Sequence, residues 1–427
     1  MMGAANAYEE IRSGVLAHLE RAKLDPKTNL EGVRQAVVDT VEGYQVRAHL
    51  GEGRALRDPK DMVGRVLTSI TGFGPLTELL TRPDIEEVFI EGSRVSYLDA
   101  MGHLQGLSVP TSEAENRQII DRLLATTQRH LDAQNPIVQA RVLDGKARLS
   151  AAIPPVADHL SATIRRHILR KESIHSLVER GSLTPAAASF LWATMQTTTS
   201  TVVAGPPGAG KTSLLAALIS AVPTNHCIRC CEEIRELSIP ITHGAYYEAR
   251  PPALDGSGEI PLRELVKFIL AMRPDRIVVG EVRGAEAFEL TRAVNAGCGF
   301  ACTVHANSAR EALNALVNAA IMAGENVTEQ IVRKVFSAAI DFVVYCDRDD
   351  INRDDTTAGI RRQVMEILAV VPTLNGDFSA EPIFVREELG KPLVWTGAVP
   401  PNAELIERAL PEGITLRAIL ERRSLPL

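Results

Sequence analysis

Apolar positions recur at helical spacing from Tyr8 to Asp61. Pro26 separates two apolar stripes that follow this spacing. The stripes are Ile11, Val15 and Leu19, then Val33, Val37, Val41 and Tyr44. This pattern predicts a helical N-terminal arm over residues 1–64, to which the sequence assigns no chemistry.

Short strand-like runs, punctuated by glycine and proline, follow between Gly72 and His167. Residues 87–91 and 147–153 are two of these runs. They predict a small mixed α/β domain over residues 65–168. A second helical pattern, from residue 170 to residue 200, then leads into the rest of the chain.

Beyond residue 200, strand-like runs alternate with helical patterns. These runs are residues 226–231, 245–248, 276–280, 300–304, 340–345 and 362–370. Such alternation predicts a parallel sheet covered by helices on both faces, which binds ligands at the carboxyl ends of its strands. We assign residues 171–395 to this α/β domain and residues 396–427 to a C-terminal tail without an assigned role.

A phosphate-binding loop follows the β-branched run at 201–203 and precedes an apolar helical pattern. Its residues are Gly205, Pro206, Pro207, Gly208, Ala209, Gly210, Lys211, Thr212 and Ser213. Glycines let successive backbone N–H groups point at a polyphosphate, the lysine reaches the β- and γ-phosphates, and the threonine hydroxyl binds Mg²⁺. The motif predicts ATP and Mg²⁺ as ligands; the alternative is a glycine-rich turn with an incidental lysine.

A continuous apolar run at 277–279 ends at Gly280 and Glu281. An ATPase needs a carboxylate at this place to support Mg²⁺ or to orient and deprotonate the attacking water. Gly280 occupies the position where an aspartate is usual, so Glu281 becomes the candidate acid and, with Thr212, the candidate metal ligand. A solvated loop carboxylate is the alternative.

Three further candidates also follow predicted strands. Glu232 and Glu233 end one strand and His305 ends another, so the parallel sheet places them at the same edge as the loop. An acidic helix N-terminus explains the glutamates nearly as well, and a lone histidine is more often structural than catalytic.

Composition narrows the class of protein. The 427 residues carry 46 basic and 53 acidic side chains and a net charge of −7, without the basic excess of a protein that mainly grips nucleic acid. Apolar runs are too short to span a bilayer, and glutamates in the first residues argue against a secretory signal. We therefore expect a cytoplasmic protein. Its six cysteines indicate buried structural thiols, with a zinc site as the alternative.

Four sequence boxes resemble, in order and spacing, those of the secretion ATPases, the traffic ATPases of type II and type IV secretion and of pilus assembly. The boxes are residues 205–212, 231–237, 272–284 and 303–308. The likeness also covers residues 72–76, 84–88, 250–252, 263–266 and 310–313. It is strongest to the CpaF/TadA branch, which serves Flp/Tad pili. Three departures from the family's pattern are the Gly-Pro-Pro start of the loop, Glu233 in place of an aspartate, and Cys298 in place of a histidine.

The resemblance implies roles for individual residues. Glu281 would activate or position water, Glu232 and Glu233 would support Mg²⁺ and water, and His305 would sense the γ-phosphate. The other implied site residues are arginines: Arg273 and Arg283 in the third box, and Arg141, Arg148 and Arg165 in the N-terminal domain. Arginines suit this task because their planar guanidinium groups bind phosphate with two hydrogen bonds.

The resemblance also implies a domain architecture and a biological function. It predicts a RecA-like P-loop ATPase domain preceded by a PAS-like α/β domain and the helical arm. It implies a homohexamer, peripheral at the inner face of the cytoplasmic membrane, that acts on a polytopic membrane platform protein to drive pilin or secreted substrates. The acidic charge balance makes DNA an unlikely partner. The alternatives are an AAA+ unfoldase or DNA-translocating ATPase, and a nucleotide-gated assembly scaffold without turnover.

Overall fold

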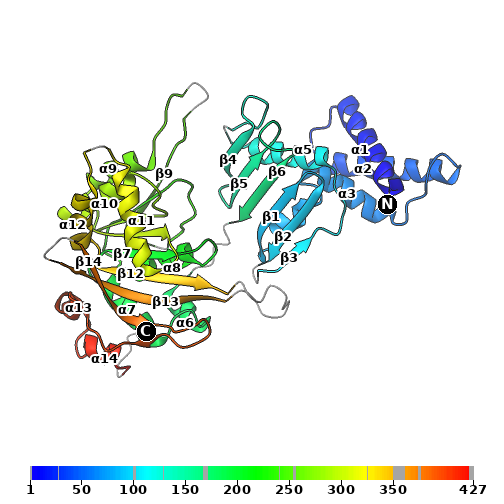
Figure 1. Ribbon diagram of the computed structural model, residues 1–427. Helices are drawn as coiled ribbons and strands as arrows, with labels where there is room; N and C mark the ends of the chain where they lie inside the picture. The colour runs from blue at the N-terminus through cyan, green and yellow to red at the C-terminus, as the bar shows by residue number, and fades with distance from the viewer. Residues whose placement is uncertain are drawn as a thin grey trace. The chain divides into compact units, whose positions relative to one another are not determined.

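The structure, a computed structural model, divides the chain into two compact units, Met1–Ile168 and Leu169–Leu427 (Figure 1). The described residues are 2–26, 28–99, 102–127, 129–166, 172–239, 241–252, 256–324, 326–349, 361–373 and 377–422. Residue 171, where the predicted third domain begins, and residues 423–427 of the predicted tail lie outside them.

The first unit begins with three helices, α1 (Met2–Ala22), α2 (Leu30–His49) and α3 (Pro59–Thr71). Their apolar stripes pack against one another in a single cluster. Tyr8 Oη donates a 2.6 Å hydrogen bond to Glu115 Oε1 on α5 (Glu113–Leu124), and Arg65 lies over the Tyr8 ring. The helical arm is therefore docked on the domain that follows it.

That domain is a six-stranded sheet in the order β3-β2-β1-β6-β5-β4, in which every pair is antiparallel. Its strands are β1 (Ile85–Glu91), β2 (Arg94–Asp99), β3 (Leu104–Gly106), β4 (Ile137–Val142), β5 (Ala147–Ala152) and β6 (Ser161–Arg166). Helices α4 (Leu76–Thr81) and α5 share one apolar core with the sheet. The core therefore covers one face of the sheet.

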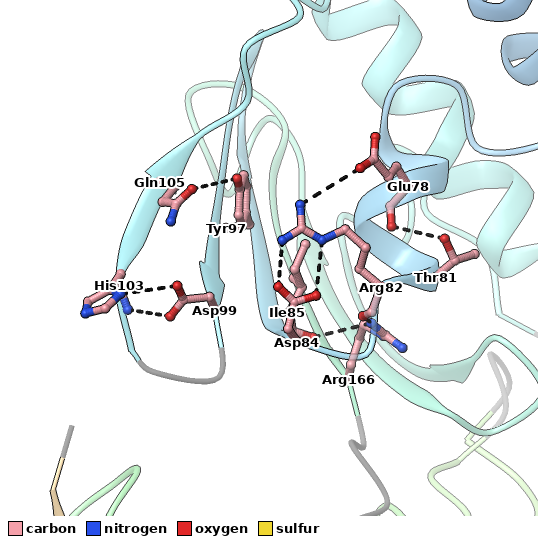
Figure 2. A network of polar contacts seen from close by, with 10 residues as sticks. All are labelled: Glu78, Thr81, Arg82, Asp84, Ile85, Tyr97, Asp99, His103, Gln105 and Arg166. Carbon is pink, nitrogen blue, oxygen red and sulfur yellow. Dashed lines mark hydrogen bonds and ion pairs between the residues drawn. The ribbon is translucent and has the colours of Figure 1, made fainter. Parts of the chain in front are cut away.

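A polar network fixes the end of β6 (Figure 2). Arg166 Nη1 donates to the carbonyl oxygen of Arg82, just after α4. Arg82 in turn holds Asp84 with two hydrogen bonds, of 3.1 Å and 2.6 Å, at the start of β1. The contacts tie β6 to the α4–β1 turn, one residue beyond Arg165.

The second unit is built on a nine-stranded sheet in the order β15-β14-β13-β12-β7-β11-β10-β8-β9. Its strands are β7 (Thr201–Gly205), β8 (Ile228–Glu232), β9 (Gly244–Glu248), β10 (Arg276–Val279), β11 (Gly299–His305), β12 (Phe342–Arg348), β13 (Arg362–Pro372), β14 (Phe378–Val385) and β15 (Val394–Trp395). From β12 to β9 all pairs are parallel, as predicted. The expectation of a wholly parallel sheet is wrong for β13, β14 and β15. Strand β13 pairs antiparallel with β12 and with β14, and β14 pairs antiparallel with β15.

Helices cover both faces of this sheet (Figure 1). One face carries α6 (Ile174–Glu179), α7 (Pro185–Met195), α8 (Lys211–Ser220), α13 (Ala403–Ala409) and α14 (Leu416–Leu420). The other carries α9 (Leu262–Leu270), α10 (Glu286–Asn295), α11 (Ala309–Ile321) and α12 (Glu329–Ala339). This three-layer α/β arrangement is the RecA-like fold that the sequence predicted. Helices α13 and α14, in the predicted tail, contribute to the core beside α7.

Within the described part of the chain, we find no helix with the length and apolar character needed to cross a bilayer.

Candidate active site

The phosphate-binding loop joins the fully buried strand β7 to helix α8. Gly208 and Gly210 have φ angles of 76° and 88°, in the left-handed region that glycine adopts at low cost. Pro206 and Pro207 lack backbone N–H groups, whereas every residue from Gly208 to Thr212 has one. The donors that a phosphate needs therefore lie at the start of α8, where the helix dipole favours anions.

Lys211, 7% exposed, begins α8 and extends back along the loop. Its Nζ donates to the carbonyl oxygens of Gly205 and Pro206, at 3.0 Å and 3.1 Å. It also lies 3.0 Å from His305 Nδ1, because β11 pairs with β7 so that His305 is level with Gly205. The ammonium group is thus held at the mouth of the loop, where phosphate oxygens would compete for it.

Glu281 lies two residues beyond β10 and contacts two other predicted site residues. Its Oε1 is 2.5 Å from His305 Nε2 and its Oε2 is 2.6 Å from Arg283 Nη2. Thr303 Oγ1 donates a 2.6 Å hydrogen bond to the carbonyl oxygen of Gly280 and so fixes the backbone just before the acid. The structure thereby joins Lys211, His305, Glu281 and Arg283 in one series of polar contacts, which we call the site chain.

Glu286 fixes the other side of this turn. This carboxylate is 8% exposed, and its Oε1 accepts hydrogen bonds from the backbone N–H groups of Arg283 and Gly284, at 2.7 Å and 2.8 Å. Because Glu286 begins α10, the helix itself anchors the turn that carries Glu281.

His305 bridges a cation and an anion. A neutral imidazole has one donor and one acceptor nitrogen, so Nδ1 accepts from Lys211 Nζ, while Nε2 lies 2.5 Å from Glu281 Oε1. Burial lowers the pKa of His305, and the nearby Lys211 charge lowers it further against the opposing effect of Glu281. The neutral form is therefore the one that fits both contacts.

Glu232 and Glu233 have different surroundings although they are adjacent. Glu232 is 4% exposed, and its Oε1 accepts 3.1 Å hydrogen bonds from the N–H groups of Glu236 and Leu237, while Glu233 is exposed. A Cβ at Gly280 would lie 2.6 Å from Glu232 Cγ. A side chain at position 280 would therefore require the Glu232 side chain to move.

In the first unit, Arg141, Arg148 and Arg165 are direct cross-strand partners on β4, β5 and β6. Paired residues of an antiparallel sheet share a face, so the three form a row, which we call the arginine row. The row continues to Glu87 on β1, whose Oε1 lies 3.6 Å from Arg165 Nε. Neighbouring residues such as Leu149 and Ile164 are fully buried in the core, so the arginine row occupies the opposite face of the sheet.

Within the second unit, Arg273 lies at the edge of the sheet opposite the phosphate-binding loop. It precedes β10 and therefore lies at the amino edge of the sheet, whereas the loop and Glu281 lie at the carboxyl edge. Its guanidinium is exposed and its φ is 49°, an uncommon value for a residue with a side chain.

Two arginines that no sequence motif marks lie against the loop instead. Arg362 Nε donates a 2.9 Å hydrogen bond to the carbonyl oxygen of Gly208, and Arg348 approaches the same glycine. Their position depends on the pairing of β12 with β13, so only a prediction of that pairing could have identified them.

The oxygen donors suit Mg²⁺, which prefers carboxylate and hydroxyl oxygens and completes its shell with phosphates and water. Thr212 in the first turn of α8 and Glu281 are the side chains that would hold it, and the bound ion would neutralise charge on the phosphates. Cysteines 230, 231, 298, 302 and 346 are buried free thiols. Among the residues with described positions, no group of three or more His, Cys, Asp or Glu side chains is arranged to hold a metal.

Known proteins are similar to this chain in sequence. The family model described as type II/IV secretion system protein matches residues 70–345. A "Putative conjugal transfer protein" of Mycobacterium tuberculosis is 37% identical over 58% of this chain and 73% of its own length. The conjugal transfer protein TrbB of Rhizobium radiobacter is 26% identical over 79% of this chain and 96% of its own.

Among solved structures, the VirB11 ATPase of the Brucella suis type IV secretion system, in complex with sulphate, matches with a TM-score of 0.36 and 22% identity. The match covers 72% of this chain and 96% of that one. The family match spans the phosphate-binding loop, Glu281 and His305. The chain belongs to the type II/IV secretion system protein family, within the superfamily of secretion ATPases.

Proposed function

We propose that this chain hydrolyses ATP with Mg²⁺ and uses the energy to drive secretion or pilus assembly. The observation that carries the proposal is the site chain, which connects the lysine of the phosphate-binding loop, through His305, to the acid after β10. A scaffold that only binds nucleotide has no need of an acid held in this way.

The site chain suggests how the residues would share the work. Glu281 stands beyond the loop, on the side where the γ-phosphate end of the nucleotide is expected, and would orient and deprotonate water. His305 touches both the phosphate-binding lysine and this acid, so it would report γ-phosphate contact to Glu281. Arg283 holds the second carboxylate oxygen and thereby fixes the direction of the first.

We further propose the working assembly that the resemblance to the CpaF/TadA branch implies: a homohexamer at the inner face of the cytoplasmic membrane, acting on a polytopic platform protein to move pilin or secreted substrates. The arginine row gathers three cations on the face of the sheet away from its apolar core. We propose that these cations neutralise phosphate charge during hydrolysis.

Two substitutions test the reaction. Lys211→Ala should reduce both nucleotide affinity and turnover, leaving less than about a tenth of the wild-type rate, because it removes a phosphate contact. Glu281→Gln keeps the shape of the acid, so we expect ATP binding within a few-fold of wild type and turnover lower by about 10²-fold or more.

Lys334→Ala, at an exposed position on α12, is the control and should change neither the ATP affinity nor the turnover. ATP binding by calorimetry and phosphate release measure the two effects separately. Full turnover in the Lys211→Ala variant would exclude the proposed reaction.

A second candidate function is the translocation of DNA, which the names of the conjugal transfer relatives favour. A DNA motor holds phosphates, so its binding weakens steeply as salt rises and its hydrolysis increases with DNA. With 46 basic against 53 acidic residues, we expect saturating DNA to change the ATPase rate by less than about twofold. A large, salt-sensitive stimulation by DNA would favour the second candidate.

A further inference from the structure

Two arginines of the second unit lie against the phosphate-binding loop without belonging to any of the sequence boxes. Arg348 ends β12 and Arg362 begins β13, and the two are direct cross-strand partners. Both are half-buried. They lie on the same face of the hairpin, so their guanidinium groups approach the loop together.

The contact with the loop is close. Arg362 Nε donates a 2.9 Å hydrogen bond to the carbonyl oxygen of Gly208, and its Cδ passes 3.7 Å from where a Cβ on Gly210 would be. A Cβ on Gly208 would collide with Nη1 of Arg348. The two side chains therefore cover the loop where its glycines have left-handed backbone angles.

The order of the strands shows which end of a nucleotide these arginines would meet. Strand β7 leads into the loop, with β11 and β10 on one side of it and β12 and β13 on the other. Glu281 and His305 follow β10 and β11, so they define the side on which the γ-phosphate is cleaved. We expect a nucleotide whose phosphates occupy the loop to extend its base and ribose away from that side, toward β12.

We propose that Arg348 and Arg362 form the nucleoside subsite, binding the base and ribose of a purine nucleotide whose phosphates lie in the loop. This inference rests on the proposed ATPase function. A guanidinium group suits the task because its flat faces stack on an aromatic base while its edges donate hydrogen bonds to ribose or α-phosphate oxygens. Both arginines also interact with other groups of the chain, so a nucleotide would exchange some of these contacts for its own.

The experiment compares ATP with inorganic tripolyphosphate, which has the phosphates but lacks base and ribose. Binding of each to the full-length chain is measured by calorimetry with Mg²⁺, for wild type, Arg348→Gln, Arg362→Gln and the double variant. Arg361→Gln is the matched control, since Arg361 is the exposed neighbour of Arg362 and precedes the hairpin strand. Thermal unfolding of each variant verifies that the fold is retained.

We expect the double variant to bind ATP at least 10-fold more weakly while its affinity for tripolyphosphate stays within about threefold of wild type. The control should bind both ligands as wild type does. Unchanged ATP binding would overturn the inference. Equal weakening of both ligands would also overturn it, because the arginines would then only support the loop. A wild-type chain that binds neither ligand would instead refute the proposed function, and this inference with it.

Discussion

At the scale of single residues, the carboxylate of Glu232 is buried. Burial raises the pKa of Glu232 to about 7, although hydrogen bonds from Glu236 and Leu237 oppose the change. An acid whose pKa is higher in the folded than in the unfolded state binds more protons when folded. The free energy of unfolding should therefore be largest below the unfolded pKa and fall as pH rises toward 7.

We predict that Glu232→Gln flattens this dependence between about pH 5 and 7.5, where the wild type loses up to roughly 3 kcal/mol of stability to ionisation of the group. The amide keeps an acceptor oxygen for the backbone N–H groups and has no charge to bury. Urea unfolding at several pH values measures the slope. Glu233→Gln, at the exposed neighbouring position, is the control and should keep the wild-type slope. A wild-type curve that rises from pH 5 to 7 would contradict the prediction.

At the scale of elements, Arg276 fastens β10 to the segment before β7. The side chain is fully buried, and its Nη1 and Nη2 donate to the carbonyl oxygens of Thr199 and Thr197, at 2.6 Å and 2.5 Å. Burial lowers the pKa of Arg276 to about 10, which still leaves it charged at neutral pH. Arg276 therefore has a structural role, although it lies within the third sequence box, residues 272–284.

We predict that Arg276→Leu destabilises the fold by about 3 kcal/mol, because it leaves two buried carbonyl groups without their donors. Arg417→Leu is the control: it removes an exposed arginine from α14 and should change stability by less than about 0.5 kcal/mol. The midpoints of denaturant unfolding compare the two. If both substitutions lowered the free energy of unfolding by the same amount, the buried Arg276 would stabilise the fold no more than an exposed arginine does.

At the scale of the whole molecule, the groups of the proposed mechanism are divided between the two units. The first holds the arginine row and the second the phosphate-binding loop and the acid. We predict that a variant with Arg141, Arg148 and Arg165 all changed to Gln still binds ATP within a few-fold of wild type but hydrolyses it at least 10-fold more slowly. Arg94→Gln, an exposed arginine on β2 of the same sheet, is the control. Wild-type turnover in the triple variant would remove the arginine row from the proposed mechanism.

The sequence predicted those features that depend on local pattern and chain order. The predicted runs that became β8, β10 and β11 match the structure within two residues at each end, and a parallel sheet then places Glu281 and His305 beside Lys211. Arg273 could also have been placed at the far edge, because it precedes its strand. The position of Arg348 and Arg362 could not have been predicted from the sequence, because it depends on an antiparallel pairing that no residue near the loop reveals.

The crowding between Gly280 and Glu232 also limits how this family can vary. A Cβ at position 280 would lie 2.6 Å from Cγ of Glu232, so a side chain there needs the Glu232 side chain to shift. We therefore expect an aspartate at position 280 to be tolerated better together with a smaller residue at 232 than on its own. Relatives should thus fall into two sequence classes, distinguished by which strand supplies the buried carboxylate.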